Sequence, residues 1–344
     1  MPAPTGRQPL RFGLVCLPRS VASAVADARL AEDVGFRLVG IADSQSVFRE
    51  LYAVTALCAQ ATRRVLIGPT VTNPLTRHPA VAASAIATVD EIAPGRTIFG
   101  LGSGDSAILN LGERPATMAG LRAYLEAMRG LFTGHDTDWH GKRIRLSWPL
   151  RPVPLYLAAE GPRTLELAGE LGDGVIVNLG LQPALVREAV TRIQLGARRA
   201  GRDPAALDLW TLVRVNVVDD VAAGIDEIKM ELASSAHHVF RFTLEGKQVP
   251  PELTDAIRRV QQGYQPAAHE RLGSSPNAAL LDADPALLRY LADRFAVVGP
   301  PEACAAKLRA VAEAGIGGIL FTGFVPDRHR LIRTLGEQVL PRLA

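Results

Sequence analysis

Short continuous runs of apolar residues recur along the chain, and each follows an amphipathic stretch that ends in glycine. The stretch 31–35, Ala-Glu-Asp-Val-Gly, leads into the apolar run 37–41. The stretches 168–172 and 312–315 lead into apolar runs in the same way. Glycine readily takes the positive φ of a helix C-terminus, and continuous apolar runs are typical of strands buried on both faces. The pattern therefore predicts repeated helix–strand units around a parallel sheet.

The repeat predicts eight strands with helices between them. The strands are expected near residues 10–16, 37–42, 65–71, 96–102, 154–159, 174–178, 209–217 and 317–322. The helices are expected near residues 20–34, 48–62, 79–92, 115–132, 162–171, 183–200, 220–233, 301–314 and 328–340. Ser20 suits a helix N-cap, and Pro79, Pro183 and Pro301 suit the first turn of a helix. Eight such units favour a closed (β/α)8 TIM barrel over its structural rival, a doubly wound sheet.

Two segments interrupt this alternation. Residues 133–152 have the pattern of a short hairpin insertion, and residues 234–295 form a longer insertion rich in proline and glycine. Neither holds enough apolar residues for a core of its own, so we expect a single barrel domain over 1–344. Excursions of this size over a barrel are usually binding loops or lids, and we expect 234–295 to cover the substrate pocket.

Charge and cysteine content exclude several classes of partner and site. The 344 residues carry 38 Lys+Arg and 35 Asp+Glu, a net charge of +3, with no basic tract that could follow a phosphate backbone, so nucleic acid is not an expected partner. No apolar run approaches the ~20 residues of a membrane span. Cys16, Cys58 and Cys304 are odd in number and far apart, which is typical of a protein of the reducing cytoplasm.

The scarcity of lysine and the scatter of histidine narrow the chemistry. The four lysines are expected in helices and insertions, at positions 142, 229, 247 and 307. Barrel enzymes carry their active sites at the carboxyl ends of the strands, so a Schiff-base lysine is not expected. The seven histidines make no HxH or HExxH motif, and His237-His238 falls in the insertion, so no metal site is expected. The small, weakly polar strand ends suit a planar cofactor that brings its own reactivity.

The two most informative segments follow the third and fourth predicted strands. Residues 68–79 read Gly-Pro-Thr-Val-Thr-Asn-Pro-Leu-Thr-Arg-His-Pro, and residues 100–105 read Gly-Leu-Gly-Ser-Gly-Asp. On its own the first is more typical of a loop with an N-cap. The second lacks the helix start and the acidic residue of a dinucleotide fingerprint, but its alternate glycines would let a large flat group approach the backbone.

Together these segments resemble the cofactor motifs of the bacterial luciferase-like flavin and deazaflavin oxidoreductases, in the branch similar to F420-dependent methylenetetrahydromethanopterin reductase. Further matches lie at 41–43, 158–162 and 173–176, and the resemblance covers roughly residues 10–344. It implies a TIM barrel that binds coenzyme F420. It also implies hydride transfer between the deazaflavin C5 and a small organic substrate, with reduction of a C=C or C=N bond expected.

The resemblance implies roles for single residues around the cofactor ring. A non-prolyl cis peptide between Thr70 and Val71 would support the back of the ring. Asp43 would hydrogen-bond the ring near its oxygen or N5, although a turn or cap role suits an aspartate there equally. Asn73 and Ser103 would anchor the pyrimidine end or the side chain of the cofactor.

The cofactor phosphate is expected at the helix start after the fifth strand, because exposed amides at a helix N-terminus bind anions. Arg163 or Thr164 could add a charge-assisted bond there, since no lysine is expected nearby. The complete expected cofactor set comprises Asp43, Thr70, Val71, Asn73, Gly102, Ser103, Ala159, Gly161, Pro162, Arg163, Thr164, Asn178 and Gly180.

Candidate catalytic groups are few. Asp105 is the candidate proton donor near the substrate, with a helix-cap role as its alternative. Asp43 is a second candidate, and His269 is a third because the Tyr264–His269 spacing resembles a feature of the family's insertions. Phe240, Phe242 and Tyr264 are expected to wall the substrate pocket. Ser44 stands where alcohol-oxidising relatives tend to carry histidine, which argues against an alcohol substrate.

Two other functions fit the same residues. A two-component monooxygenase that uses reduced FMN and oxygen would share the fold and the phosphate site. A non-catalytic flavin-binding protein would equally explain the shortage of catalytic side chains. The resemblance further implies a homodimer that packs through the helices beside strands two to four. One of these helices carries small residues that would allow close packing, although core packing explains them as well: Ala82, Ala83, Ala85 and Ala87.

Overall fold

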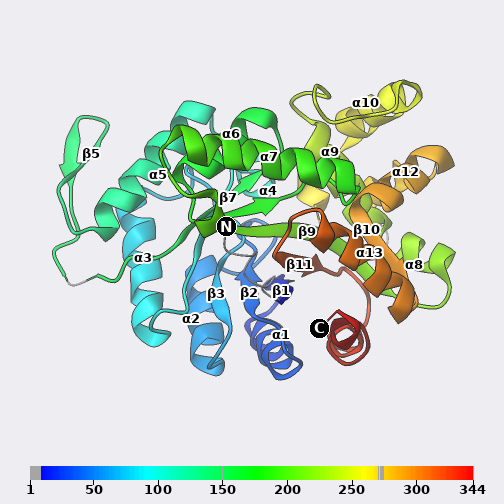
Figure 1. The fold of residues 1–344 in the computed structure, drawn as a ribbon, viewed down its shortest axis with the longest axis horizontal. Coiled ribbons are helices and arrows are strands. Elements are labelled where there is room, and N and C mark those ends of the chain that lie inside the picture. The colour runs from blue at the N-terminus through cyan, green and yellow to red at the C-terminus, as the bar shows by residue number, and fades with distance from the viewer. Residues whose placement is uncertain (1–8, 149, 270, 272–274, 344) are drawn as a thin grey trace, which may run out of the picture.

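Parallel strands curl into a nearly closed barrel in this computed structural model, which describes residues 9–148, 150–269, 271 and 275–343 (Figure 1). The barrel strands pair in the order β3-β2-β1-β11-β9-β8-β7-β4, and bridges from Ile67 to Thr97 and from Thr72 to Leu101 join β3 to the β4 segment. Their bounds are β1 (Arg11–Cys16), β2 (Leu38–Ile41), β3 (Leu66–Pro69), β4 (Phe99–Leu101), β7 (Leu155–Ala159), β8 (Gly174–Val177), β9 (Asp208–Val217) and β11 (Gly318–Thr322). The predicted TIM barrel is confirmed.

Helices alternate with these strands and surround them (Figure 1). They are α1 (Val21–Asp33), α2 (Leu51–Ala61), α3 (Pro79–Ile92), α5 (Met118–Phe132), α6 (Pro162–Leu171), α7 (Pro183–Arg199), α13 (Pro301–Glu313) and α14 (Arg328–Thr334). Ser20 caps α1 by accepting a 3.0 Å hydrogen bond from the Ser23 amide, and Pro79, Pro183 and Pro301 begin their helices as predicted. The last predicted helix ends early, because the chain passes into a π-helical turn over Leu335–Val339.

The three glycines that end the repeated helices do not share one conformation. Gly35 and Gly315 have φ of 99° and 113°, as a positive-φ cap requires. Gly172 has φ of −79°, so the prediction was wrong there. A Cβ at Gly172 would lie 2.7 Å from the carbonyl oxygen of Ala168, so close backbone approach is the reason for glycine at this position.

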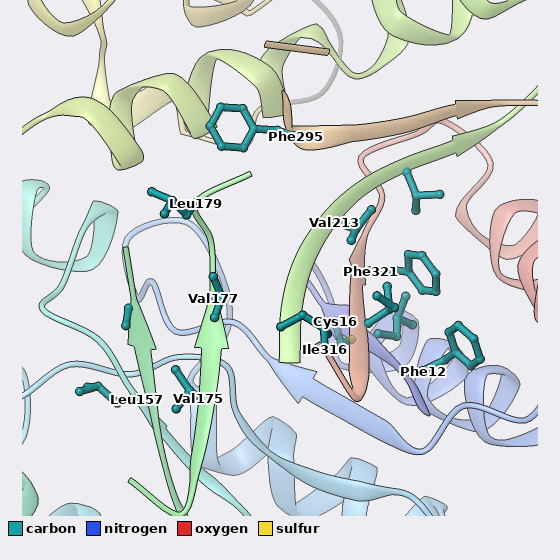
Figure 2. Packing of buried hydrophobic residues seen from close by; sticks show 14 of the residues in the cluster. Phe12, Cys16, Leu157, Val175, Val177, Leu179, Val213, Phe295, Ile316 and Phe321 are labelled. Atoms are coloured by element: carbon teal, nitrogen blue, oxygen red, sulfur yellow. The ribbon is translucent and has the colours of Figure 1, made fainter. Parts of the chain in front are cut away.

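The continuous apolar runs arise because both faces of each strand are buried. Val175 and Val177 of β8 belong to the core between strands and helices, together with Phe12 and Phe321 (Figure 2). Ile176, between them in sequence, belongs to a second cluster inside the barrel, with Leu38, Ile98, Tyr156, Trp210 and Leu320. Alternate residues of one strand thus serve two different cores.

The three cysteines lie in the core and form no disulfide. Burial raises the pKa of the Cys58 thiol to about 12 and that of Cys304 to about 11, and it also raises the pKa of Cys16. No helix of the described chain is both long enough and apolar enough to cross a membrane.

The segment 133–152 contains a two-stranded antiparallel ribbon, β5 (Thr137–Trp139) and β6 (Lys142–Ile144), which projects at the left of Figure 1. Trp139 connects it to the barrel by edge contacts with the rings of Tyr124 and His78, at centroid distances of 5.8 and 5.9 Å.

The second insertion is more helical than its sequence indicates. After α8 (Val221–Glu227), helix α9 (Lys229–Phe240) runs through the expected boundary at 234. It is followed by α10 (Thr254–Gly263), α11 (Pro276–Ala279) and α12 (Pro285–Phe295), and α9, α10 and α12 gather at the upper right of Figure 1. A strand that the sequence did not predict, β10 (Ala296–Gly299), then pairs with Arg214–Val217 of β9.

Candidate active site at the carboxyl ends of the strands

The loop after β3 packs directly on β4. The peptide bond between Thr70 and Val71 is cis, as predicted. A Cβ on Gly100 would lie 2.4 Å from the carbonyl oxygen of Pro69, and one on Gly102 would lie 2.9 Å from Cγ2 of Val71. These two glycines are therefore required by the neighbouring loop. Direct approach of a flat ligand to their backbone, the reason expected from the sequence, stays a prediction.

Asp43 ties the end of β2 to the same loop. Its Oδ2 accepts hydrogen bonds from the Thr72 hydroxyl at 2.6 Å and from Nη1 of Arg77 at 2.7 Å, and its side chain is 2% exposed. Arg77 also donates to Glu50 at 3.0 Å. The carboxylate thus serves a buried ion pair, and its expected contact with the cofactor ring and its catalytic role stay predictions.

Two buried polar atoms near the cis peptide lack partners. Asn73 accepts hydrogen bonds at Oδ1 from the amides of Leu75 and Thr76, at 3.0 and 2.9 Å. Within the described chain, neither Nδ2 of Asn73 nor Oγ1 of Thr70 has a hydrogen-bond partner. Buried polar groups in folded proteins are normally paired, so these atoms are suited to a ligand at the end of β3.

Asp105, after β4, is an ionised acceptor. Arg241, the residue after α9, donates from Nη1 to Oδ1 at 2.6 Å, and Nδ1 of His238 in α9 lies 3.1 Å from Oδ2. Burial would raise the pKa of Asp105, but the charges and hydrogen bonds of His238, His237 and Arg241 hold it well below its usual range. The prediction of a proton donor here is corrected, because this carboxyl has no proton to give at neutral pH. Its side chain makes no cap bond to the following short helix α4 (Ser106–Leu109) either.

A chain of polar contacts continues from Asp105 across the strand ends. Nε2 of His238 lies 3.0 Å from Oε1 of Glu160, at the end of β7. The same oxygen accepts a 2.7 Å hydrogen bond from Nδ2 of Asn178, after β8, and Oδ1 of Asn178 accepts one of 2.9 Å from Nη1 of Arg214 in β9. Helix α9 and four barrel strands thus meet in one network.

The expected phosphate residues at the start of α6 are largely engaged within the protein. The Thr164 hydroxyl accepts from the Gly161 amide at 3.1 Å and donates to the Gly161 carbonyl at 2.9 Å. Arg163 is exposed and lines an outer cavity of about 250 Å³ with Met118 and Arg122 of α5. The expectation that Arg163 faces the phosphate is corrected, because its side chain lies toward α5.

A lysine from the insertion occupies this region instead. Lys247 is 3% exposed, and its Nζ donates to the carbonyl of Val239. Burial lowers the pKa of Lys247, and the nearby charge of Glu160 opposes that shift. The preceding Gly246 approaches Pro162, whose Cγ would lie 3.4 Å from a Cβ at that glycine. The expectation that no lysine lies near this strand end was therefore wrong.

Arg294 of α12 supports the turn after β8. Its Nε and Nη2 donate to the carbonyl of Leu179 at 3.0 and 2.8 Å. Gly180 has φ of 132°, and a Cβ there would lie 2.9 Å from Cγ of Arg294. Glycine is required at this position because the arginine side chain crosses it.

His269 lies in a second layer behind Asp105. Its Nδ1 is 2.5 Å from the Tyr264 hydroxyl, and the Tyr264 ring stacks on that of His237 with centroids 4.0 Å apart. Nε2 of His237 lies 3.6 Å from Oδ1 of Asp105. His269 thus contacts Tyr264, which in turn packs on His237, and its expected catalytic role stays a prediction. Among the expected pocket aromatics, Phe240 is 3% exposed, whereas Phe242 is 66% exposed.

Comparison with known proteins shows the family to which the chain belongs. Residues 9–317 match the family model described as luciferase-like monooxygenase. The chain belongs to the luciferase-like monooxygenase family. It is 30% identical to 5,10-methylenetetrahydromethanopterin reductase of Methanolobus tindarius, over 96% of this chain and 100% of that protein. It is 28% identical to F420-dependent glucose-6-phosphate dehydrogenase of Nakamurella multipartita, over 97% of each chain.

A solved structure of this luciferase-like group shares the fold. Coenzyme F420-dependent tetrahydromethanopterin reductase from Methanopyrus kandleri superposes with a TM-score of 0.77 at 25% identity, over 98% of this chain and 100% of that one.

In this luciferase-like chain, sequence reasoning missed His237, His238, Arg241 and Glu160. A signal was available in their spacing, because His237 and His238 precede Arg241 by four and three residues. If the predicted helix that ends near 233 continued, this spacing would place each histidine next to Arg241 on the helix surface. In the part of the chain that the structure describes, no group of three or more His, Cys, Asp or Glu side chains could hold a metal ion.

Proposed function

We propose that the chain is an F420-dependent oxidoreductase that transfers hydride between the deazaflavin C5 and a small organic substrate. The observation that carries this proposal is an apolar cluster at the carboxyl end of the barrel, here called the apolar mouth, with buried cations near it. Its residues belong to the inner cluster: Leu17, Val47, Phe48, Val71, Ala158, Met230 and Phe324. The cations are Arg241 on Asp105, Lys247 near Glu160, Arg214 on Asn178 and Arg294 on the Leu179 carbonyl.

The two halves of this site match the two halves of the cofactor. An apolar mouth suits a flat tricyclic ring and excludes water from it, and buried cations favour an anionic tail. F420 carries such a ring and an acidic phosphate tail, and its C5 supplies the hydride when bound. The unpartnered Nδ2 of Asn73 and Oγ1 of Thr70 would donate to its polar edge.

Other residues at the strand ends would hold the cofactor by shape. Val71 and Gly102 would form the surface behind the ring, and Ser103 would border it. Ala159 is 1% exposed, so it would support this end of β7 from the core. The tail would pass Gly161, Pro162, Thr164, Asn178 and Gly180 toward Lys247. We leave Asp43 and Arg163 out of this set, because the Asp43 side chain is 2% exposed in its ion pair and Arg163 lines the outer cavity beside α5.

The substrate end favours reduction over alcohol oxidation. Ser44, next to Asp43, is buried, and its hydroxyl lies 2.9 Å from that of Ser106. A neutral hydroxyl held in this way is a poor base for removing the proton of an alcohol. Reduction of a C=C or C=N bond needs no such base, so we propose this direction.

Cofactor titration tests the proposal. The fluorescence of F420 should be quenched in a saturable way as the protein is added, and FMN should bind more weakly. Lys247→Ala should weaken F420 binding about tenfold, the factor that corresponds to about 1.4 kcal/mol. Lys307→Ala is the matched control, because this lysine lies on α13, where its Nζ donates to the Asp293 carbonyl. The Lys307→Ala variant should bind F420 with the affinity of the native chain.

Each other outcome assigns a different function. Tight FMN binding without F420 affinity, with oxygen uptake beside a flavin reductase, would identify a two-component FMN monooxygenase instead. Tight cofactor binding with no substrate-dependent change in the cofactor's redox state, across electron-poor alkenes and imines, would favour a non-catalytic binding protein.

We further propose a cytoplasmic homodimer that packs through α2 and α3. Leu57, Leu75 and Val81 are 42%, 50% and 58% exposed on or beside these helices. The small residues expected at this interface are mostly core residues, because Ala82, Ala83 and Ala87 are at most 3% exposed. Free, buried cysteines are compatible with a reducing compartment.

A further inference from the structure

His238 lies between two carboxylates that belong to different strands. Its Nδ1 is 3.1 Å from Oδ2 of Asp105, after β4, and its Nε2 is 3.0 Å from Oε1 of Glu160, after β7. Asp105 is 133 residues away in sequence. The imidazole of one helix residue therefore bridges two distant parts of the barrel rim.

This geometry requires a particular protonation state. A neutral imidazole has one N–H donor and one acceptor nitrogen, whereas imidazolium donates from both nitrogens. Carboxylates only accept, so a neutral ring would direct one lone pair at a negative oxygen. Both contacts are favourable together only while His238 is charged.

The contacts of α9 show what this bridge holds in place. Arg241, the C-cap residue of α9, donates to Oδ1 of Asp105 at 2.6 Å and to the Gly104 carbonyl at 2.8 Å. Lys247 follows in the segment after α9, where its Nζ donates to the Val239 carbonyl of that helix. The two cations proposed to face the cofactor tail thus depend on where α9 sits.

We propose that His238 is a positioning residue whose proton fixes α9, with Arg241 and Lys247, over the ends of β4 and β7. Only the identity of the ligand rests on the proposed function. The charged or titratable groups that face His238 and its partners are Asp105, Glu160, Arg241, His237 and Lys247. The site then binds its anionic ligand well while His238 is charged and less well when the proton is lost.

The direction of the pH effect follows from these neighbours. Burial works against the charge of His238, but Glu160 and Asp105 outweigh it and raise the pKa from 6.5 to about 9. The bridge is therefore formed at neutral pH. Its contribution to stability is complete below pH 6.5 and is lost as the pH rises through about 9.

The first test measures the protonation of His238 directly. In protein labelled with 13C at histidine, His238, assigned through His238→Gln, should titrate near pH 9. Glu160→Gln should lower that midpoint, because it removes the stronger of the two charge partners. His329, which pairs with Asp27 at 3.1 Å on another face, is the control, and Glu160→Gln should leave its signal unaffected. A His238 midpoint near 6.5, or one that Glu160→Gln leaves unchanged, would overturn the proposal.

The second test links that proton to binding. F420 affinity is measured from about pH 7 to about pH 10 in the native chain, His238→Gln and His329→Gln, after thermal unfolding shows that the variants fold. The native chain and His329→Gln should share a loss of affinity near pH 9. His238→Gln should bind about tenfold more weakly at neutral pH and lack that step. Any titration of F420 itself affects all three chains alike, so the difference between their pH profiles reports His238 alone.

The two proposals fail separately. If F420 binds but His238→Gln keeps the native affinity and pH profile, the positioning role is wrong and the proposed function stands. If F420 does not bind, amide hydrogen exchange of α9 decides the matter. Faster exchange in His238→Gln than in His329→Gln at neutral pH supports the positioning role without the proposed cofactor, and equal exchange overturns it.

Discussion

Two ion pairs in this protein show how burial changes the loss of stability that follows when one partner is removed. In the Arg77–Asp43 pair the side chains are 16% and 2% exposed, whereas in the Arg122–Glu170 pair they are 41% and 35% exposed. Water can solvate either member of the second pair if the other is removed. It cannot do so for Asp43, which also accepts from Thr72.

Arg77→Ala should therefore be far more damaging than Arg122→Ala. Removing one member of a buried pair typically costs about 3–5 kcal/mol, and we expect a loss in that range for Arg77→Ala. Exposed pairs contribute about 0–1 kcal/mol, which is the loss expected for Arg122→Ala. Urea unfolding of both variants measures the difference, and equal losses would show that the Asp43 carboxylate gains other partners when Arg77 is absent.

At the scale of secondary-structure elements, two glycines let α6 and α7 touch. A Cβ on Gly169 would lie 1.9 Å from the carbonyl oxygen of Ile193, and one on Gly196 would lie 1.9 Å from that of Glu166. The backbones of the two helices are thus in direct contact at each glycine. Because the obstructing atoms belong to the backbone, a side chain at either position would push the helices apart.

Gly169→Ala should destabilise the protein despite the better helix propensity of alanine. Overpacking a tight contact costs about 1–3 kcal/mol, which exceeds the gain of roughly 1 kcal/mol in propensity. Gly120→Ala on α5 is the matched control, because its nearest neighbouring atom would be 3.5 Å away and its propensity gain should remain. Thermal unfolding should give a lowered midpoint for the first variant and an unchanged or raised one for the second.

At the scale of the whole molecule, the apolar surface on α2 and α3 bears on assembly. If two copies pack there, Leu57→Asp with Val81→Asp should turn a dimer into a folded monomer, because buried unpaired carboxylates oppose association. Val221→Asp on α8, where the native side chain is 43% exposed, is the control and should leave the mass unchanged. Sedimentation equilibrium reads out the result, and a native monomer would refute the interface.

The barrel wall could be predicted from sequence because its signal is local. Val175, Ile176 and Val177 are apolar in succession since each strand faces two cores, and a run of that kind is visible without knowing its neighbours. The cis peptide at Thr70 was predictable only through family resemblance. Strand β10 begins directly after the last residue of α12, so its short apolar run is not set off from the helix, and its pairing with β9 defines it as a strand.

The network around Asp105 was beyond prediction for a related reason. His238 and Arg241 meet Asp105 only because α9 returns over the barrel, and no local sequence pattern shows that return. Asp105 was found by its place after β4, but its role changed once the neighbouring charges were known. Position at a strand end could be inferred from sequence, whereas protonation state depended on partners distant in sequence.

The buried thiols make the native chain a ready background for site-specific labelling. Cys16, Cys58 and Cys304 are at most 1% exposed and hold their protons, so a maleimide dye should leave the folded protein unmodified, since thiolates are the reactive form. Phe242→Cys would then add one accessible sulfur beside Arg241 at the tip of α9. A dye there would report movement of the insertion in real time, without first removing any native cysteine.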